Sequence, residues 1–365
     1  MRVAVVHPKF DRSGGAERYA LGLAGGLAAR GHTVDLFGRR AGVLPSGCRF
    51  HRLTALSFGR ALKTYSFWRA AERGLSAGGY DVIQGFGKTT CQSVHRTGGG
   101  VHRAYLERTG AGRPSLYDRV VLMIEDRLFA SPGLRTIICP SSWVAAEVER
   151  HYPVVRERIR VIANGVDTAA YTPAGREADR ESLTAELGLD RLATLVLFVA
   201  TNFRLKGLDL ALRALARLDG ARLVVVGGDD PAPFQGLAGE LGVGERVHFR
   251  GALEDAGPEY RAADLLLHPT RYDPFANVCL EALACGTPVV TSERNGVADL
   301  LEDGEGGGVV PLAEWPEVAV AVAQGLLARG GEERARARGL AERHSAERHL
   351  DAVEGVYRAA LGDRS

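Results

Sequence analysis

The sequence predicts an α/β protein of two doubly wound domains, each a parallel sheet covered by helices. The chain has 365 residues, which is more than one hydrophobic core usually organises. Short valine-rich apolar runs alternate with amphipathic segments, as expected for repeated βαβ units. The order of strand, polar loop and helix begins at residue 2 and again near residue 195. Two separate cores are therefore expected.

The first half opens with an apolar run at Arg2–Val6 that predicts a buried strand. After a polar loop with two glycines, Tyr19–Arg30 has the pattern of an amphipathic helix, and Gly31 ends it. Thr33–Phe37 is the next buried strand, so these segments form a βαβ unit with a parallel pair. Further strands are expected at Val82–Ile83, Thr136–Cys139 and Ile159–Ile162.

The second half repeats this plan. Leu195–Val199 predicts a strand, Asn202–Gly207 a polar loop, Leu208–Leu218 a helix and Leu223–Val226 the next strand. Further strands are expected at Val247–Phe249, Leu265–His268 and Pro288–Thr291. The second domain should therefore be another doubly wound sheet.

The predicted domains are residues 1–170 and 171–345. The stretch Asn164–Arg180 is rich in Gly, Pro, Asp and Thr, as expected for a linker. The segment 346–365 has apolar residues at helical spacing, and we expect this helix to cross back to the first domain. Two such domains would face a central cleft lined by the carboxyl ends of both sheets, where open α/β sheets bind ligands.

Composition excludes several classes of protein. Hydrophobic residues make up 45% and charged residues 25%, which disfavours both disorder and a fibrous repeat. No run approaches the ~20 apolar residues needed to span a bilayer, and MRVAVVHPKF is too short an apolar run for a secretory signal, so a cytoplasmic location is expected. The five scattered cysteines show no zinc spacing, so we expect reduced thiols and no metal site.

The most specific local pattern is Asp273-Pro-Phe-Ala-Asn-Val-Cys-Leu-Glu281, between a predicted strand and a predicted helix. Residues 275–278 should start the helix, where unpaired N–H groups and the helix dipole attract a diphosphate. Asp273 can accept hydrogen bonds from sugar hydroxyls, and Glu281 can bind a ribose diol. The pattern favours a nucleotide sugar. The alternative is a helix cap at Asp273 and a surface ion pair at Glu281.

Two cations, Arg204 and Lys206, directly precede Gly207 in the first loop of the second domain. They can neutralise a departing nucleotide diphosphate, which a metal ion does in other enzymes. Lysine is rare in this arginine-rich chain, so its use at position 206 suggests a site that requires a compact charge. The alternative is that both cations are simply solvated.

Gly14-Gly15-Ala16-Glu17 occupies the first βα turn. Glycines let the backbone approach a phosphate or a sugar closely. Neither a GxGxxG pattern nor a P-loop lysine accompanies them, which argues against dinucleotide binding and NTP hydrolysis. Asp229-Asp230 follows a predicted strand without further nearby ligands, so we predict a turn there and not a metal site.

Together these segments resemble the family-4 retaining glycosyltransferases over nearly the whole chain. The matching motifs are GGAER, NGVD, FRLKG, VVVGG, ERVHFRG, AADLLLHP, the acid pair of residues 273–281, and GTPVV. IQGFGKTTCQ, followed by HRTGGGVHRAYLER, is similar to the lipopolysaccharide-core hexosyltransferase branch of the family. The first acid of the family's acid-x7-acid motif is usually Glu, whereas Asp273 stands here.

The resemblance implies a GT-B fold with two Rossmann-like domains, an acceptor in the N-terminal domain and a donor in the C-terminal domain. It implies that a hexose moves, with retention, from a nucleotide diphosphate sugar, expected to be a UDP-sugar, to a glycan or glycolipid acceptor without a metal or other cofactor. The implied catalytic residues are His102, Arg204, Lys206 and Asp273. The implied donor-binding residues are Gly14, Gly15, Arg250, Phe275, Ala276, Asn277, Val278 and Glu281. The leaving diphosphate is expected to deprotonate the acceptor hydroxyl on the same face of the sugar.

A histidine of this family lies near the transferred sugar, and the candidates here are His102 and His95. We favour His102 because the glycines before it allow close approach to a ligand. The alternative is that His102 is a structural loop residue. His95, Lys88 and Arg103 are the acceptor-side candidates.

Three other functions are compatible with a two-domain α/β chain. A nucleotide-sugar epimerase of GT-B fold, the main alternative, would not need a basic acceptor surface. A pyridoxal phosphate-dependent phosphorylase needs a Schiff-base lysine deep in the cleft, whereas Lys206 lies beside Gly207. A sugar-binding protein would usually be secreted. No nucleic-acid partner is expected.

Positive charge is concentrated in the first domain. Residues 49–73 carry six Arg or Lys against a single acid, and residues 96–119 add five arginines. Four aromatic residues lie among the cations of residues 58–73, a mixture that suits a lipid headgroup interface. We therefore expect peripheral binding to an anionic surface on the inner face of the membrane. The alternative is aromatic side chains in the core and arginines in solvent.

Overall fold

The computed structural model describes residues 1–11, 14–56, 58–75, 78–110, 112–152, 156–301 and 303–362. The chain forms two compact units, Met1–Ala163 with Glu347–Ser365, and Asn164–Ala346. The first crossing thus lies after residue 163, whereas the sequence suggested residue 170. The reason is that Val166 forms a parallel bridge with Ser345, which attaches the start of the predicted linker to the second unit.

The N-terminal unit contains a seven-stranded parallel sheet in the order β5-β3-β1-β6-β7-β8-β9. Its strands are β1 (Arg2–Val6), β3 (Thr33–Gly38), β5 (Cys48–Arg52), β6 (Val82–Gly85), β7 (Val94–Arg96), β8 (Thr136–Cys139) and β9 (Ile159–Val161). Val3 pairs with Val34 on one side and Val82 on the other. The strand order reverses between β1 and β6, and ligands bind at such a switch point in open α/β sheets.

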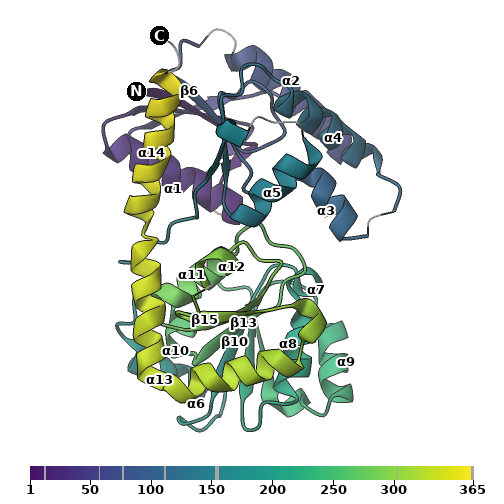
Figure 1. The fold of residues 1–365 in the computed structure, drawn as a ribbon, viewed down its shortest axis with the longest axis vertical. Helices are drawn as coiled ribbons and strands as arrows, with labels where there is room; N and C mark the ends of the chain where they lie inside the picture. Colours follow the sequence, from purple (N-terminus) through teal and green to yellow (C-terminus); the bar gives the residue numbers. More distant parts are fainter. Residues whose placement is uncertain are drawn as a thin grey trace. The chain divides into compact units, whose positions relative to one another are not determined.

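Helices cover this sheet (Figure 1). They are α1 (Gly15–Ala29), α2 (Arg60–Leu75), α3 (His102–Arg108), α4 (Leu116–Phe129), α5 (Ser142–His151), the 3₁₀ turn η1 (Arg156–Arg158) and α14 (Ala346–Gly362). A short parallel pair, β2 (Lys9–Phe10) and β4 (Arg40–Ala41), lies apart from the main sheet.

The C-terminal helix α14 belongs to the N-terminal unit, where it lies beside α1 (Figure 1). Leu350 and Val353 join the core formed by β1 and α1, and a Cβ on Gly26 of α1 would lie 2.7 Å from Leu350 Cδ2. Tyr357 is fully buried, and its hydroxyl donates a 3.0 Å hydrogen bond to Gln84 of β6. The expected return of this helix to the first domain is confirmed.

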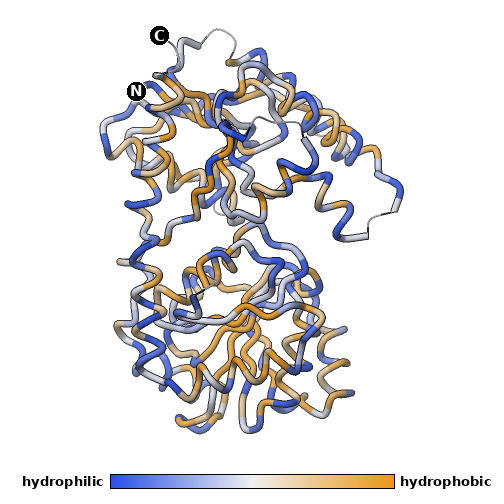
Figure 2. Tube along the Cα trace, in the orientation of Figure 1, coloured by the Kyte–Doolittle hydropathy of each residue, from blue (hydrophilic) through white to orange (hydrophobic). Residues whose placement is uncertain are grey.

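The C-terminal unit contains a six-stranded parallel sheet in the order β12-β11-β10-β13-β14-β15. Its strands are β10 (Leu195–Val199), β11 (Arg222–Val226), β12 (Val247–Gly251), β13 (Leu265–His268), β14 (Val289–Ser292) and β15 (Gly307–Val310). The central strands are apolar, as their orange colour in Figure 2 shows. The switch point of this sheet lies between β10 and β13.

The helical segments of this unit are α6 (Arg176–Glu186), α7 (Phe203–Lys206), α8 (Leu208–Leu215), α9 (Ala232–Glu240), η2 (Gly244–Arg246), α10 (Gly257–Ala262), α11 (Asn277–Ala284), α12 (Ala298–Leu301), η3 (Leu312–Glu314) and α13 (Glu317–Arg343). The predicted polar loop at 202–207 contains the one-turn helix α7. Gly330 interrupts α13 with φ 49° and ψ −118°.

Two expectations from composition can be compared with this structure. The five cysteines are free, as expected from their spacing. Within the described residues, none of the helices combines the length and the apolar character that crossing a bilayer requires.

Candidate active site

The loop between β13 and α11 carries the first acid of the sequence motif, Asp273. Two backbone hydrogen bonds hold this residue: its N–H donates to Arg294 O, and its C=O accepts from Gly296 N–H, each at 2.9 Å. Its Oδ1 accepts from the Phe275 N–H at 3.1 Å. Asp273 is therefore fixed in the backbone as well as in its side chain.

The Asp273 carboxylate is paired with Lys206 from the neighbouring loop. Lys206 Nζ lies 2.6 Å from Asp273 Oδ2 and also donates to Tyr272 O at 3.2 Å. His268, at the end of β13, is buried, and its Nε2 lies 3.7 Å from the same oxygen. One carboxylate oxygen thus faces a cation and an imidazole.

Burial and charge act on Asp273 in opposite directions. Burial alone would raise the pKa of Asp273, but the positive charge of Lys206, followed by the contribution of nearby His268, outweighs it. The net pKa of Asp273 lies well below its ordinary value. Burial, in turn, lowers the pKa of His268. The site therefore keeps Asp273 ionised as a hydrogen-bond acceptor.

Helix α7 positions Lys206. The Asn202 side chain caps α7 by accepting from the Leu205 N–H at 2.9 Å, and Gly207 ends it with φ 81°. A Cβ at position 207 would lie 2.1 Å from Pro269 O, so close approach of the two loops also requires glycine. Gly207 thus allows the two loops to approach closely enough for Lys206 to contact Asp273.

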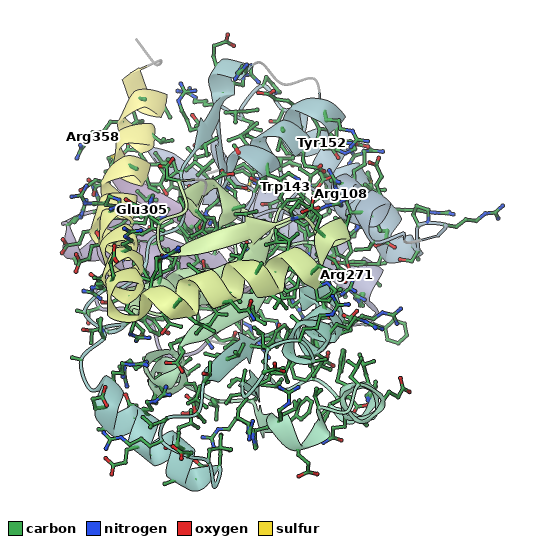
Figure 3. The ribbon with its side chains drawn as sticks, turned by 60° about the horizontal axis from the view of Figure 1, so that its bottom comes forward. Arg108, Trp143, Tyr152, Arg271, Glu305 and Arg358 are labelled. Carbon is green, nitrogen blue, oxygen red and sulfur yellow. The ribbon has the colours of Figure 1, made fainter. Side chains whose placement is uncertain are left out.

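Arg271, in the loop after β13, stabilises the position of α7. Its guanidinium forms two hydrogen bonds with the Asp209 carboxylate, at 2.9 and 2.7 Å, and one with Arg204 O at 2.7 Å. The Arg271 side chain is marked in Figure 3. Arg204 itself has an exposed side chain. Of the two predicted cations, Lys206 is therefore anchored at Asp273, whereas Arg204 extends into solvent.

Residues 275–278 lie at the start of α11, as the sequence predicts. Ala276 is the N-cap residue, and its N–H already donates to Asn295 Oδ1 at 3.1 Å. Asn277 and Val278 are the first residues of the helix, so their N–H groups have no acceptor one turn earlier. Phe275 and Ala276 are buried, and the other two are half-buried.

Glu281 lies about one turn into α11, because the helix begins at Asn277. Tyr260 of α10 donates a 2.9 Å hydrogen bond to Glu281 Oε2. Burial, followed by the charge of Glu281, raises the pKa of Tyr260 well above its ordinary value, so this hydroxyl stays protonated. Tyr260 therefore orients the Glu281 carboxylate, whose contact with a ribose stays a prediction.

Arg250 lies on the edge strand β12 and is already engaged by two carboxylates. Its Nη2 is 3.2 Å from Glu259 Oε1, and its Nη1 forms an ion pair with Glu186 of α6. These ion pairs explain its position within the unit. A donor contact of Arg250 stays a prediction.

In the N-terminal unit, several predicted residues line one pocket of about 340 Å³, which we call the histidine pocket. Lys88, His95 and His102 line it together with His7 and Glu17. Its other lining residues are Ala16, Phe86, Gly87, Arg96, Thr97, Gly99, Gly100, Tyr105, Tyr117, Val121, Glu125, Leu128 and Phe129. His7 follows β1 and Lys88 follows β6, so the pocket lies at the switch point of this sheet.

His102 is the first residue of α3, and its imidazole has an acidic partner. Its Nε2 lies 3.0 Å from Asp118 Oδ1, and its backbone N–H donates to Glu125 Oε2 at 2.8 Å. Hydrogen bonds from Ser115, with a smaller contribution from His102, lower the pKa of Asp118. The carboxylates of Asp118 and Glu125 thus fix His102 at the start of α3, and its catalytic role stays a prediction.

His95 and His7 line the same pocket as neutral imidazoles. Burial and then the charge of Arg96 lower the pKa of His95 to about 3. Burial also lowers the pKa of His7, whose Nδ1 lies 2.6 Å from Lys9 O. Because Nδ1 donates to that carbonyl, Nε2 of His7 is the nitrogen that can accept a hydrogen bond.

Arg103, Gly14 and Gly15 are the remaining predicted residues of this unit, and they differ in how they lie relative to the histidine pocket. Arg103 is not among the lining residues, and it instead pairs with Asp126 at 2.8 Å and lies over the Tyr152 ring. Gly14 is the N-cap residue of α1, where a Cβ would lie 2.7 Å from Glu17 Oε2, and Gly15 begins the helix. The two glycines therefore lie next to the histidine pocket.

Helix α3, which carries His102, packs against α5. The Arg108 guanidinium forms a 2.5 Å ion pair with Glu147 and lies 5.8 Å from the Trp143 ring (Figure 3). Tyr152 donates to Glu125, whose carboxylate accepts the first N–H groups of α3. These contacts fix the helix that carries His102.

Sequence reasoning missed His7, His268 and Tyr260. His7 directly follows the first predicted strand, and that position could have indicated a residue at the ligand-binding edge. His268 and Tyr260 gave no such signal, because their roles depend on which loops the sheet brings together.

The predicted turn at Asp229-Asp230 is confirmed. Asp229 accepts from the Phe203 N–H at 2.9 Å, and Asp230 accepts from the Ala232 N–H at 3.0 Å. In the parts of the chain that the structure describes, no group of three or more His, Cys, Asp or Glu side chains is placed to hold a metal ion.

Comparison with known proteins agrees with these two units. Residues 13–170 match the family model described as Glycosyltransferase Family 4, and residues 179–344 match Glycosyl transferases group 1. The chain is 39% identical over 184 residues to the D-inositol 3-phosphate glycosyltransferase of Mycobacterium sp. (strain KMS), a match that spans 47% of this chain and 40% of that relative.

A second relative matches over most of the chain. The lipopolysaccharide glucosyltransferase WaaG of Escherichia coli (strain K12) is 27% identical over 321 residues, 85% of each chain. The crystal structure of WaaG, a glycosyltransferase involved in lipopolysaccharide biosynthesis, superposes with a TM-score of 0.83 at 25% identity, covering 97% of this chain and 99% of that chain.

The two Rossmann-like parallel sheets and the superposition on WaaG show that the chain has the GT-B fold. The chain belongs to the glycosyltransferases that join a family-4 domain to a group-1 domain. The matches reported above are all to glycosyltransferases, so the epimerase alternative has no support.

Proposed function

We propose that this chain transfers a hexose from a UDP-sugar to a glycan or glycolipid acceptor, with retention of the anomeric configuration and without a metal ion. The observation that carries the proposal is the pairing of Lys206 with Asp273 beside the start of α11. That arrangement supplies a cation and helix N–H groups for a diphosphate, and a carboxylate for sugar hydroxyls.

In the proposed reaction, the bond between the anomeric carbon and the donor phosphate oxygen breaks. The acceptor oxygen then bonds to the same face of the anomeric carbon, and its proton passes to the departing phosphate oxygen. Lys206 and Arg204 stabilise the charge that develops on the diphosphate. Asp273 orients the hexose, and Glu281, held by Tyr260, binds the ribose.

The acceptor side of the proposal uses the histidine pocket. A hydroxyl entering it would meet the Nε2 of neutral His7 as an acceptor, and His102 with its Asp118 partner. Lys88 and His95 line the same space. The WaaG relative is a lipopolysaccharide glucosyltransferase, so glucose is the first donor sugar to test and a glycolipid the first acceptor.

We further propose that the enzyme attaches peripherally to the inner face of the membrane through α2 and the segment before it. Leu56 and Phe58 are 54% and 85% exposed, and Leu62 and Tyr65 on α2 are exposed as well. Phe67 and Trp68, by contrast, are buried, so only part of the aromatic set is available to lipid. Exposed apolar side chains among cations suit a headgroup interface.

Incubation with UDP-glucose and other UDP-hexoses, together with a glycolipid extract, tests the proposal. UDP release that depends on both the sugar nucleotide and the acceptor supports it. Interconversion of the UDP-sugar to an epimer without UDP release would instead identify the epimerase alternative.

A further inference from the structure

A second pocket of the N-terminal unit, about 350 Å³, adjoins the histidine pocket. We call it the basic pocket, because five of its lining residues are basic. These are Lys9, Arg39, Arg60, Lys63 and Lys88. His7, Glu17, Lys88 and Tyr117 line both pockets. The two spaces therefore form one continuous surface at the carboxyl end of β1.

These five cations are not paired with acids among the described residues. None of them forms an ion pair with a carboxylate in the described part of the chain, and Glu17 is the one acid among the residues that line the pocket. Other arginines of this unit are paired, such as Arg103 with Asp126 and Arg108 with Glu147. Uncompensated positive charge is therefore concentrated in this pocket.

The concentration of positive charge is unfavourable for Arg39 and Lys63. Arg39 Nε is buried and has no hydrogen-bond partner among the described residues, and a buried donor left unpaired destabilises the fold. The charge of Arg39, followed by burial and the charges of Lys9 and Arg40, lowers the pKa of Lys63. A bound anion would satisfy the Arg39 donor and offset the repulsion between cations.

Tyr117 and the backbone at Lys88 hold two of the cations in place. The Arg60 guanidinium lies 4.3 Å from the centre of the Tyr117 ring, and Lys88 Nζ lies 5.6 Å from it. Lys88 has φ 61°, a left-handed conformation that is rare for a residue other than glycine. Such strain is found where the surrounding structure fixes a residue for binding.

We propose that the basic pocket binds a phosphate group of the acceptor and that the acceptor of this enzyme is therefore phosphorylated. This inference rests on the proposed function. A phosphate carries nearly two negative charges and several acceptor oxygens, which suits a set of guanidinium and ammonium donors that lack carboxylates. With the phosphate held there, the hydroxyl of the same molecule lies in the adjoining histidine pocket.

Calorimetry with glycerol 3-phosphate tests the site, with glycerol as the uncharged counterpart and saturating UDP present. We expect glycerol 3-phosphate to bind and glycerol not to bind. Lys63→Gln and Arg39→Gln should each weaken binding by about tenfold or more, the loss of one charge-assisted contact. Arg52→Gln, which removes an exposed cation from β5, should have no effect. Thermal unfolding checks that each variant is folded.

A second arm separates two sources of the phosphate. Vesicles of phosphatidylcholine with phosphatidic acid present it on a lipid, and vesicles of phosphatidylcholine alone are the control. Binding to glycerol 3-phosphate supports the site, and so does binding to the phosphatidic acid vesicles alone. In either case, Lys63→Gln and Arg39→Gln must weaken the binding more than Arg52→Gln does. No binding in either arm, or equal effects of all three substitutions, would overturn the proposal. Nucleotide-sugar turnover that depends on Lys206 reports on the proposed function separately.

Discussion

Lys206 Nζ lies 2.6 Å from Asp273 Oδ2, although the two residues are 67 positions apart in the sequence. Lys206 follows β10 and Asp273 follows β13, and these strands pair in parallel, so their carboxyl ends lie at one edge of the sheet. In the proposed function, Lys206 donates hydrogen bonds to the diphosphate of the sugar nucleotide. The Asp273 carboxylate instead accepts hydrogen bonds from hydroxyl groups of the sugar.

Substitution of Lys206 by alanine should lower turnover by ~10²-fold or more, because a cation that stabilises a leaving group acts mainly in the transition state. Arg204→Ala should have a smaller effect, because the Arg204 side chain is exposed. Steady-state kinetics of UDP release provide the measurement. Arg213→Ala, which removes an exposed cation from α8, is the control. Turnover of Lys206→Ala equal to that of Arg213→Ala would refute the role.

Glu281→Ala should weaken donor binding more than it slows the chemical step, because ribose contacts are equal in the ground and transition states. Asp273→Asn should instead lower kcat. Calorimetry with UDP and kinetics with the UDP-sugar distinguish the two effects.

Tyr260→Phe is a more conservative test of the same carboxylate, because it removes only the hydroxyl that donates to Glu281. We expect a smaller loss of UDP affinity than in Glu281→Ala. Unchanged UDP affinity in both variants would contradict the ribose assignment.

Stability should fall as the solution is acidified below about pH 6.5. His95 has its pKa lowered from 6.5 to about 3 by burial and then by Arg96, and His349 has its pKa lowered to about 4, mainly by burial. The unfolded chain binds protons in this interval that the folded chain excludes, so each histidine costs up to about 1.4 kcal/mol per pH unit.

His95→Gln should therefore reduce the dependence of the unfolding free energy on pH between 6.5 and 4. Urea unfolding at several pH values measures this dependence. Parallel curves for the wild type and His95→Gln would show that His95 is not kept neutral by the fold.

Binding to vesicles that contain anionic lipid should be sensitive to salt, with about 1 kcal/mol from each engaged cation. Changing Lys63, Arg69 and Arg73 together to Gln should weaken it. Because Lys63 lines the basic pocket, the pair Arg69→Gln and Arg73→Gln, with Lys63 retained, isolates the surface beside Leu62 and Tyr65. Sedimentation decides the question, and equal recovery with anionic and neutral vesicles would exclude this membrane surface.

The sequence predicts much of this fold because its buried strands are apolar and their spacing is regular. It missed β15, whose Gly307 and Gly308 disfavour a strand by propensity. The structure explains the glycine: a Cβ at position 307 would lie 2.2 Å from Val289 O. It also missed β5, an edge strand with charged, exposed side chains.

The candidate site was predictable only in part. The start of α11 followed from local pattern, since helix termini have local signals. The pairing of Lys206 with Asp273, the hydrogen bond from Tyr260 to Glu281 and the clustering of cations around Arg39 depend on strand order. Strand order brings together residues that are distant in the sequence, and no local pattern specifies it.

The anomeric configuration of the first-formed product tests the central claim most directly. The enzyme is incubated with a UDP-α-hexose and an acceptor that it glycosylates, with and without EDTA. The new glycosidic linkage is followed by proton NMR. We predict an α-linked product, formed at the same rate with and without EDTA. A β-linked product, or loss of activity in EDTA that magnesium or manganese restores, would contradict the account.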